Sequence, residues 1–212
     1  MSDAENRRPL ASRDTGWAQG VARRIAKTSV SPNQISMFSM VFAALAGASF
    51  FLAGSAEGSG RIAALLVGGL CTQARLLCNL FDGMVAIEAG KKEPDGAFWN
   101  EFPDRVADLL ILVGLGYGVG EPVLGWAAAG FAILTAYVRE LGRACGQPAD
   151  FSGPMAKPHR MAAVTIAAAL TLFEPLWNGR NEVLTAALWI IAIGAAVTAL
   201  RRSWRLVARL RG

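Results

Sequence analysis

Residues 79–108, NLFDGMVAIEAGKKEPDGAFWNEFPDRVAD, decide the fold, because they put carboxylates and amides into a chain that is otherwise strongly apolar. Of the 212 residues, 53% are hydrophobic and 17% are charged, a composition too apolar for an ordinary soluble domain. Asp82, Asp104 and Asp108 are therefore expected in or beside membrane hydrocarbon, where an ionised side chain costs at least about 2.5–3.5 kcal/mol and usually has a function. The sequence predicts an integral membrane protein with a functional site in this stretch.

The spacing of these polar residues indicates the kind of site. Asn79 and Asp82 are three residues apart, and Asn100, Asp104 and Asp108 follow one another at intervals of four. Each set therefore lies on one face of its own helix. Two helices that present oxygen ligands to each other predict a site for a hard divalent cation.

Apolar runs that can cross a bilayer recur along the chain, and they predict an all-α, polytopic membrane fold. Six membrane-spanning helices are expected at residues 34–54, 62–89, 97–118, 122–144, 161–177 and 182–200.

The part of the chain before these spans divides into two segments. Residues 1–14 are polar and are expected to form a disordered tail. Residues 15–30 are expected to form an amphipathic helix, because Trp17 and Val21 recur at helical spacing opposite several basic residues. Such a helix is suited to lie on an anionic membrane surface. Residues 31–212 are then one membrane domain.

The distribution of basic residues predicts the orientation of the spans. Nearly all Lys and Arg lie in the two ends of the chain and in the loops near residues 90–96 and 147–160, whereas the opposite loops hold only Arg61 and Arg180. The positive-inside rule therefore places both termini and the Asn/Asp cluster on the cytoplasmic side.

The composition also excludes other classes of protein. The net charge is +5, but the basic residues sit at segment ends without interleaved aromatic residues, so no nucleic-acid partner is expected. Three cysteines without CxxC spacing indicate neither a disulfide framework nor a zinc site.

The order of the polar and small residues resembles the signature of the CDP-alcohol phosphotransferase family, D-x-x-D-G-x-x-A-R, eight residues, then G-x-x-x-D-x-x-x-D. The resemblance is strongest over residues 32–160 and includes a Ser-Pro-Asn-Gln entry to the first span. The signature positions in this chain are Asn79, Asp82, Gly83, Ala86, Gly96, Asn100 and Asp104.

This resemblance implies an enzyme of phospholipid biosynthesis in the bacterial inner membrane. It implies transfer of a substituted phosphoryl group, such as phosphatidyl, from a CDP-linked lipid donor such as CDP-diacylglycerol to a small hydroxyl acceptor, with release of CMP. It also implies a homodimer and dependence on Mg²⁺ or Mn²⁺, because carboxylate-bound cations neutralise the charge of a diphosphate.

The resemblance and the spacing together suggest a role for each candidate residue. The metal-site candidates are Asn79, Asp82, Asn100, Asp104 and Asp108. Asp108 is the first candidate for the general base, with Asp104 as the second. Gly83, Ala86 and Gly96 are expected to face the nucleotide. The basic residues expected to bind a phosphate of donor or acceptor are Lys157, Arg160, Arg139 and Arg143.

This chain departs from the family signature at three positions. Asn79 and Asn100 replace the first and third acidic residues, and Ile87 replaces the Arg. An Asn can ligate through its carbonyl oxygen but adds no charge. The pattern resembles a bacterial branch of the family with Asn at these two positions, in which Asp108 would compensate for a lost ligand or act as base.

Structural interpretations remain open for the same residues. Asn79 could hydrogen-bond between helices, and the small residues could serve helix packing alone. Lys157 and Arg160 could follow from the positive-inside rule. Asp104, Asp108 and Arg105 could belong to a local ion-pair and helix-capping network.

Three other functions remain open for the whole chain. A catalytically inactive relative, a transporter that uses intramembrane carboxylates and an intramembrane aspartyl protease each fit part of the pattern. Metal-dependent release of CMP separates all three from the transferase.

Overall fold

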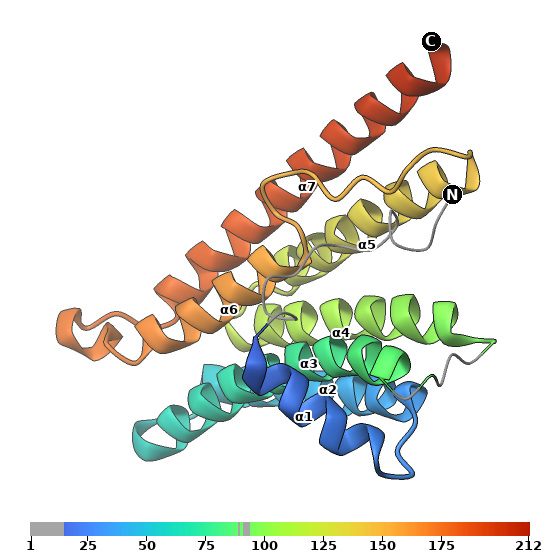
Figure 1. Cartoon of the computed structure of the whole chain (residues 1–212). Coiled ribbons are helices and arrows are strands. Elements are labelled where there is room, and N and C mark those ends of the chain that lie inside the picture. Colours follow the sequence, from blue (N-terminus) through green and yellow to red (C-terminus); the bar gives the residue numbers. More distant parts are fainter. Residues whose placement is uncertain (1–14, 89, 91–93) are drawn as a thin grey trace.

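The computed structural model describes residues 15–88, 90 and 94–212, so the tail expected at residues 1–14 lies outside the described residues (Figure 1). All regular structure in this described part is helical, which confirms the expected all-α fold. The elements in chain order are α1 (Gly16–Ala26), α2 (Pro32–Ser55), α3 (Gly58–Glu88), α4 (Gly96–Gly118), α5 (Pro122–Ala144), α6 (Lys157–Thr171), the 3-10 helix η2 (Glu174–Trp177) and α7 (Glu182–Arg211).

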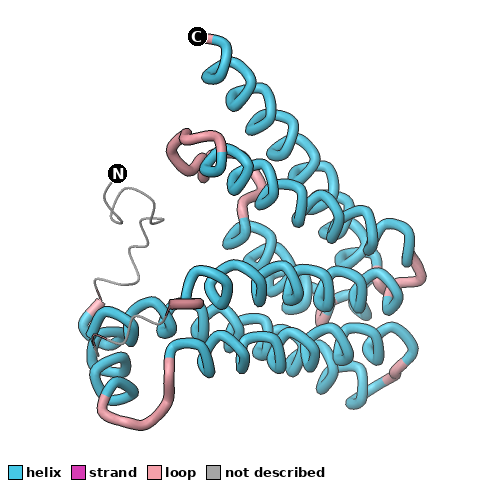
Figure 2. Tube along the Cα trace, turned by 90° about the vertical axis from the view of Figure 1, so that its right-hand side faces the viewer, coloured by secondary structure: helices cyan, strands magenta, loops and turns pink. Residues whose placement is uncertain are grey.

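Helices α2 to α7 form a closed ring of packed neighbours. Helix α2 packs against α3, α3 against α6, α6 against α7, α7 against α5, α5 against α4, and α4 back against α2. Figures 1 and 2 show α2, α3 and α4 as one group and α5, α6 and α7 as another, with the C-terminal end of α7 projecting beyond the bundle. An apolar core that includes Phe50, Ile111 and Leu188 fills the ring. Inner faces of α3, α4 and α6 can therefore meet although they are distant in sequence.

Four of these helices, α2, α3, α5 and α7, are long and apolar enough to cross a membrane. Helix α4 carries several charged side chains, and α6 has 15 residues. The helix at the expected fifth span, residues 161–177, has other bounds, whereas the expected sixth span, residues 182–200, lies within the longer helix α7. Helix α6 begins at Lys157 because Pro158 suits a first helical turn, and its continuation ends in η2, which contains Pro175. Helix α7 continues to Arg211 because its last turns are rich in Arg, Leu and Ala.

Glycines let α2 and α4 approach closely. A Cβ added to Gly114 would lie 2.4 Å from the backbone oxygen of Gly47, and one added to Gly118 would lie 2.2 Å from that of Phe50. Both separations are far below van der Waals contact, so only glycine fits at these positions. Close approach through small residues is a common way for membrane helices to pack. It brings the polar face of α4 next to α2 and α3.

Helix α1 packs across α3. Its Ala18 and Ala22 are fully buried, and Trp17 meets Phe81 of α3 edge-on with ring centroids 6.1 Å apart. Arg23, like the other basic residues of this segment, is exposed. Residues 16–26 thus form a helix that packs on α3 through small residues on one face.

Candidate functional site

A polar cluster joins α3, α4 and α6 around Asp104, whose side chain is 8% exposed. Its Oδ1 accepts hydrogen bonds from Nδ2 of Asn79 and from Nη2 of Arg75, the latter at 3.2 Å. Its Oδ2 accepts a hydrogen bond from Nζ of Lys157 and lies 3.6 Å from Nη2 of Arg105. One carboxylate thus contacts three cations and an amide.

Asp82 lies on α3, one turn after Asn79, and is held by α2. Helix α2 begins at a capping box in which Ser31 and Gln34 satisfy each other's backbone N–H groups. This start places Ser36 opposite α3, where its hydroxyl donates to Oδ2 of Asp82 at 2.7 Å. The other oxygen accepts from the backbone N–H of residue 83 at 2.5 Å. Asp82 therefore lies one helical turn from Asn79, which contacts Asp104.

Asp108 and Arg160 form a buried ion pair below this cluster. Nη2 of Arg160 donates to Oδ2 of Asp108 at 2.6 Å, and the two side chains are 1% and 0% exposed. Nη1 of Arg160 donates to the backbone oxygen of Met155 at 2.8 Å. The candidate base and one candidate phosphate ligand therefore bind each other, in a place that a soluble acceptor does not reach in this structure.

The structure separates Asn100 from the other metal-site candidates. Asn100 is exposed near the start of α4, and its amide lies 3.5 Å from Glu101. Gly83 and Ala86 are half-buried on α3, next to Asp82 in sequence. Gly96 begins α4 in open space, since an added Cβ would meet nothing within 4 Å. Of the five metal-site candidates, Asn79 and Asp104 are in direct contact and Asp82 lies one turn from Asn79 on α3, whereas Asn100 and Asp108 pair with other residues.

Arg139 and Arg143, the remaining basic candidates, pair with acidic residues of α4 and α5. Arg139 contacts Glu101 through Nη2 and donates to Glu140 from Nε at 2.8 Å, and its guanidinium lies 5.4 Å from the ring centre of Phe151. Arg143 also donates to Glu140, at 2.8 Å. Neither arginine contacts Asp104 or Asp82 in the described structure.

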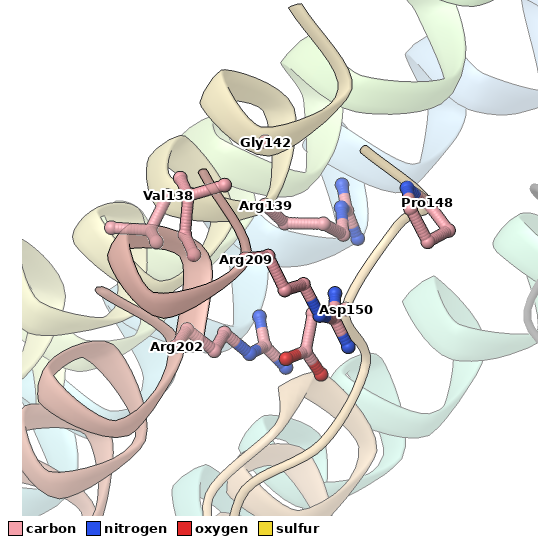
Figure 3. A pocket seen from close by; sticks show the side chains of 8 residues that line it. Val138, Arg139, Gly142, Pro148, Asp150, Arg202 and Arg209 are labelled. Atoms are coloured by element: carbon pink, nitrogen blue, oxygen red, sulfur yellow. The ribbon is translucent and has the colours of Figure 1, made fainter. Parts of the chain in front are cut away.

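A shallow depression lies beside Arg139, between α5, α7 and the loop that precedes α6. Figure 3 shows Arg202 and Arg209 beside the carboxylate of Asp150. Burial by itself would raise the pKa of Asp150, but hydrogen bonds from Ser152 and the charges of Arg205 and Arg209 outweigh it and lower the pKa. An ionised Asp150 therefore ties this loop to α7.

The sequence assigned no functional role to Arg75, Arg105 and Ser36, which contact the cluster, although it allowed an ion pair for Arg105. An arginine inside an apolar span is itself a signal of function, and Arg75 lies one turn before Asn79 on the same face of α3. Ser36 carried no comparable signal, because hydroxyls are common in membrane helices.

The residues of the cluster fit a hard divalent cation. Asp82 and Asp104 supply two carboxylates, and the Oδ1 atom of Asn79 is buried without a hydrogen-bond partner among the described residues. An unpartnered amide oxygen on a side chain that contacts one carboxylate, one helical turn from a second, suits Mg²⁺ or Mn²⁺, which take oxygen ligands and leave positions for water or phosphate. No group of three or more His, Cys, Asp or Glu comes together as a metal site within residues 15–88, 90 and 94–212.

Known proteins resemble this chain in sequence, although no family model matches it. The bifunctional IPC transferase and DIPP synthase of Rubrobacter xylanophilus is 34% identical over 134 residues, covering 59% of this chain and 28% of that protein. The phosphatidylinositol phosphate synthase of Streptomyces avermitilis is 29% identical over 132 residues, covering 58% and 54%. That of Mycobacteroides abscessus is 24% identical over 193 residues, covering 86% and 80%. The chain thus spans about a quarter and a half of the first two relatives.

Solved structures share the fold. The phosphatidylinositol phosphate synthase of Mycobacterium tuberculosis with CDP-DAG bound has a TM-score of 0.73 and 18% identity, covering 89% of this chain and 92% of that one. The same protein in complex with manganese and citrate has a TM-score of 0.74, covering 90% and 88%. With apolar helices long enough to cross a bilayer, the chain is an integral membrane protein. The spacing from Asp82 to Asp104, the sequence relatives and the shared fold make this chain similar to phosphatidylinositol phosphate synthases, in line with its resemblance to the CDP-alcohol phosphotransferase family.

Proposed function

We propose that this protein is a divalent-metal-dependent CDP-alcohol phosphatidyltransferase of phospholipid biosynthesis. It transfers the phosphatidyl group of CDP-diacylglycerol to the hydroxyl of a small acceptor and releases CMP. The observation that carries the proposal is the contact of Asp104 on α4 with Asn79 on α3, one turn before Asp82, where the amide oxygen of Asn79 is buried without a hydrogen-bond partner in the described structure. The relatives named phosphatidylinositol phosphate synthase support the same reaction class.

Three residues would hold the metal ion, namely Asp82, Asp104 and Asn79 through its Oδ1 atom. A bound Mg²⁺ or Mn²⁺ supplies positive charge that neutralises the diphosphate of the donor. Gly83 and Ala86 follow Asp82 on α3, and their small side chains leave room for the cytidine nucleotide beside the helix. Gly96 and Asn100, at the exposed start of α4, are assigned to the outer edge of the nucleotide site.

Asp104 is our choice for the group that takes the proton from the acceptor hydroxyl. Its side chain is 8% exposed, whereas that of Asp108 is 0% exposed and paired with Arg160. A general base must come within hydrogen-bond reach of the proton that it removes. Asp108 remains the second choice, because its Oδ1 atom has no hydrogen-bond partner in the described structure.

The acceptor is proposed to carry a phosphate as well as a hydroxyl group. Lys157 contacts Asp104 and is 23% exposed, so its ammonium group lies between the cluster and solvent. Arg139 and Arg143 lie further out on α5. An inositol phosphate fits both this arrangement and the names of the relatives.

The wider assignments rest on the sequence pattern. We propose that α2 to α7 all cross the membrane and that α1 lies on its surface. Both termini and the cluster then lie on the cytoplasmic side of a bacterial inner membrane, where charged substrates are available. We further propose that residues 31–212 act as one domain, that the protein is a homodimer and that it belongs to the branch with Asn at positions 79 and 100.

Release of CMP by the purified protein tests the proposed function. With CDP-diacylglycerol and Mn²⁺, we expect CMP release that depends on an inositol phosphate or glycerol 3-phosphate acceptor and that stops in excess chelator, because the diphosphate then lacks its counter-charge. Serine and choline are the unphosphorylated comparison acceptors. Folded protein that releases no CMP with any acceptor would contradict the transferase and favour an inactive relative or a transporter. CMP release that continues in excess chelator would contradict the metal-dependent mechanism.

Replacement of Lys157 tests the acceptor site. In Lys157→Gln we expect the KM for the phosphorylated acceptor to rise about tenfold while the KM for CDP-diacylglycerol changes little, because a lost ground-state contact acts on the substrate that makes it. Lys27→Gln, an exposed lysine after α1, is the matched control. An unchanged acceptor KM with a raised donor KM would indicate that Lys157 binds the CDP-linked donor instead.

A further inference from the structure

Arg75 is a fully buried arginine in the apolar helix α3, with 0% of its surface exposed. Its Nη2 atom donates to Oδ1 of Asp104 at 3.2 Å and lies 3.4 Å from the backbone oxygen of the same residue. Its Nε and Nη1 atoms have no hydrogen-bond partner in the described part of the chain. The guanidinium is therefore held by one residue only, one turn from Asn79 and two from Asp82.

A second arginine of the same helix, Arg61, provides a comparison, because its hydrogen bonds have a clear structural role. Arg61, at the opposite end of α3, donates from Nη1 to Asn181 and to the backbone oxygen of Ala53, both at 2.8 Å, and from Nη2 to Glu174 at 2.9 Å. Its contacts join three segments of the chain. Arg75 joins only α3 to α4, and Asp104 does not need it for neutrality, because Lys157 also contacts that carboxylate. Burying a charge costs several kcal/mol, so structural linkage alone is a weak reason for Arg75.

The charges around Asp104 point to another role. Arg75, Arg105 and Lys157 approach one carboxylate, while the neighbouring position 79 carries a neutral amide. Arg75 is the most deeply buried of the three cations, so solvent screens its field least. A fixed cation at 3.2 Å from Oδ1 reduces the attraction of that carboxylate for any metal ion.

Resting on the proposed function, we infer that Arg75 is a permanent internal cation of the site and a positioning residue that acts through Asp104. It orients the carboxylate and lowers its affinity for a divalent cation. It also keeps a positive charge on the buried side of the cluster, where the reaction concentrates negative charge. Preorganised charge of this kind is effective in a site from which water is excluded.

Manganese binding to the purified, detergent-solubilised protein tests this inference without turnover. In Arg75→Met we expect the Kd for Mn²⁺ to fall at least about tenfold, because removal of one unit charge this close to a divalent ion changes affinity by that much even at an effective dielectric constant near 20. Arg75→Lys, which keeps the charge, is expected to bind Mn²⁺ within about threefold of wild type. Titration calorimetry, or the electron paramagnetic resonance signal of free Mn²⁺, measures both.

Turnover gives the second readout. We expect kcat of Arg75→Met to fall about 10²-fold with nearly unchanged substrate KM values, since the lost interaction acts in the transition state. Arg75→Lys should recover part of kcat. Tighter metal binding with slower turnover is the combination that a merely structural role does not produce, because a damaged site binds the metal more weakly.

The control is Arg61→Gln, which removes an arginine from the same helix away from the cluster. We expect it to lower the thermal unfolding midpoint and to leave the Kd for Mn²⁺ unchanged. Mn²⁺ binding by Arg75→Met that equals or is weaker than wild type would overturn the inference. Should Arg75→Met not fold, Arg75→Gln carries the same expectation. Wild-type protein that binds Mn²⁺ but releases no CMP would refute the proposed transferase and leave the Mn²⁺ comparison intact.

Discussion

We expect the substitution Asp82→Asn to lower kcat for CMP release by about 10³-fold, because it removes one of two proposed anionic metal ligands in a site of electrostatic catalysis. Asparagine keeps the shape of the side chain, and its amide oxygen can still accept the hydrogen bond from Ser36. The folded yield and the thermal unfolding midpoint should therefore stay close to wild type. CMP release assays and size-exclusion chromatography on the same preparation measure the two effects.

Asp95→Asn is the matched control for this substitution. Asp95 precedes α4, is exposed and accepts hydrogen bonds from Asn33 and Trp99 at 2.9 Å each. These hydrogen bonds hold the pKa of Asp95 below its ordinary value. Its replacement removes an aspartate of the same region without touching the cluster, so activity should change less than about threefold, as for most surface substitutions. Parallel loss of yield and activity in Asp82→Asn would favour a structural role for Asp82.

Asp108→Ala has the largest expected effect on folding. The change leaves the buried guanidinium of Arg160 without its carboxylate, and such uncompensated charge typically costs about 3–5 kcal/mol. We expect little folded protein, or a large fall in the thermal unfolding midpoint of what remains. Replacing both partners with apolar residues of similar size, Asp108→Leu with Arg160→Met, should restore folding, because no buried charge is then left unpaired.

The same double variant separates the two roles proposed for Asp108. If Asp104 is the base and the Asp108–Arg160 pair only joins α4 to α6, the folded double variant should keep a kcat for CMP release within about tenfold of wild type. The reason is that the group that removes the proton is then unchanged. A folded but inactive double variant would contradict that assignment. Such a result would indicate that Asp108 is the general base or that Arg160 binds a phosphate of a substrate.

The position of each helix followed largely from local sequence. Apolar runs bounded by Ser31-Pro32, Pro122 and the Gly-rich and polar connections predicted where helices begin and end, because these signals act within a few residues. The error at α6 has the same local origin. Proline at position 158 starts a helix earlier than hydrophobicity alone indicates, and the polar first turn of α6 does not register as part of an apolar span.

The candidate site shows where local sequence stops being informative. Asn100, Asp104 and Asp108 share one face of α4, yet four residues advance a helix by about 6 Å along its axis and turn it about 40° past a full turn. The three side chains therefore reach different depths: Asn100 is exposed, Asp104 meets α3, and Asp108 is fully buried. The spacing predicted that the three side chains share one face of α4, but it did not predict which residue of another helix each side chain contacts.

The sequence by itself determined the membrane class, the helices and the pair of faces that carry Asn79, Asp82 and Asp104, because apolar length and helical period are properties of short segments. The tertiary structure decided the pairings of Arg75 and Lys157 with Asp104, of Ser36 with Asp82 and of Arg160 with Asp108. These pairings join α2, α3, α4 and α6 across up to 53 residues of sequence. They depend on how closely glycines let α2 approach α4 and on the depth at which α6 packs against α3, which no single segment encodes.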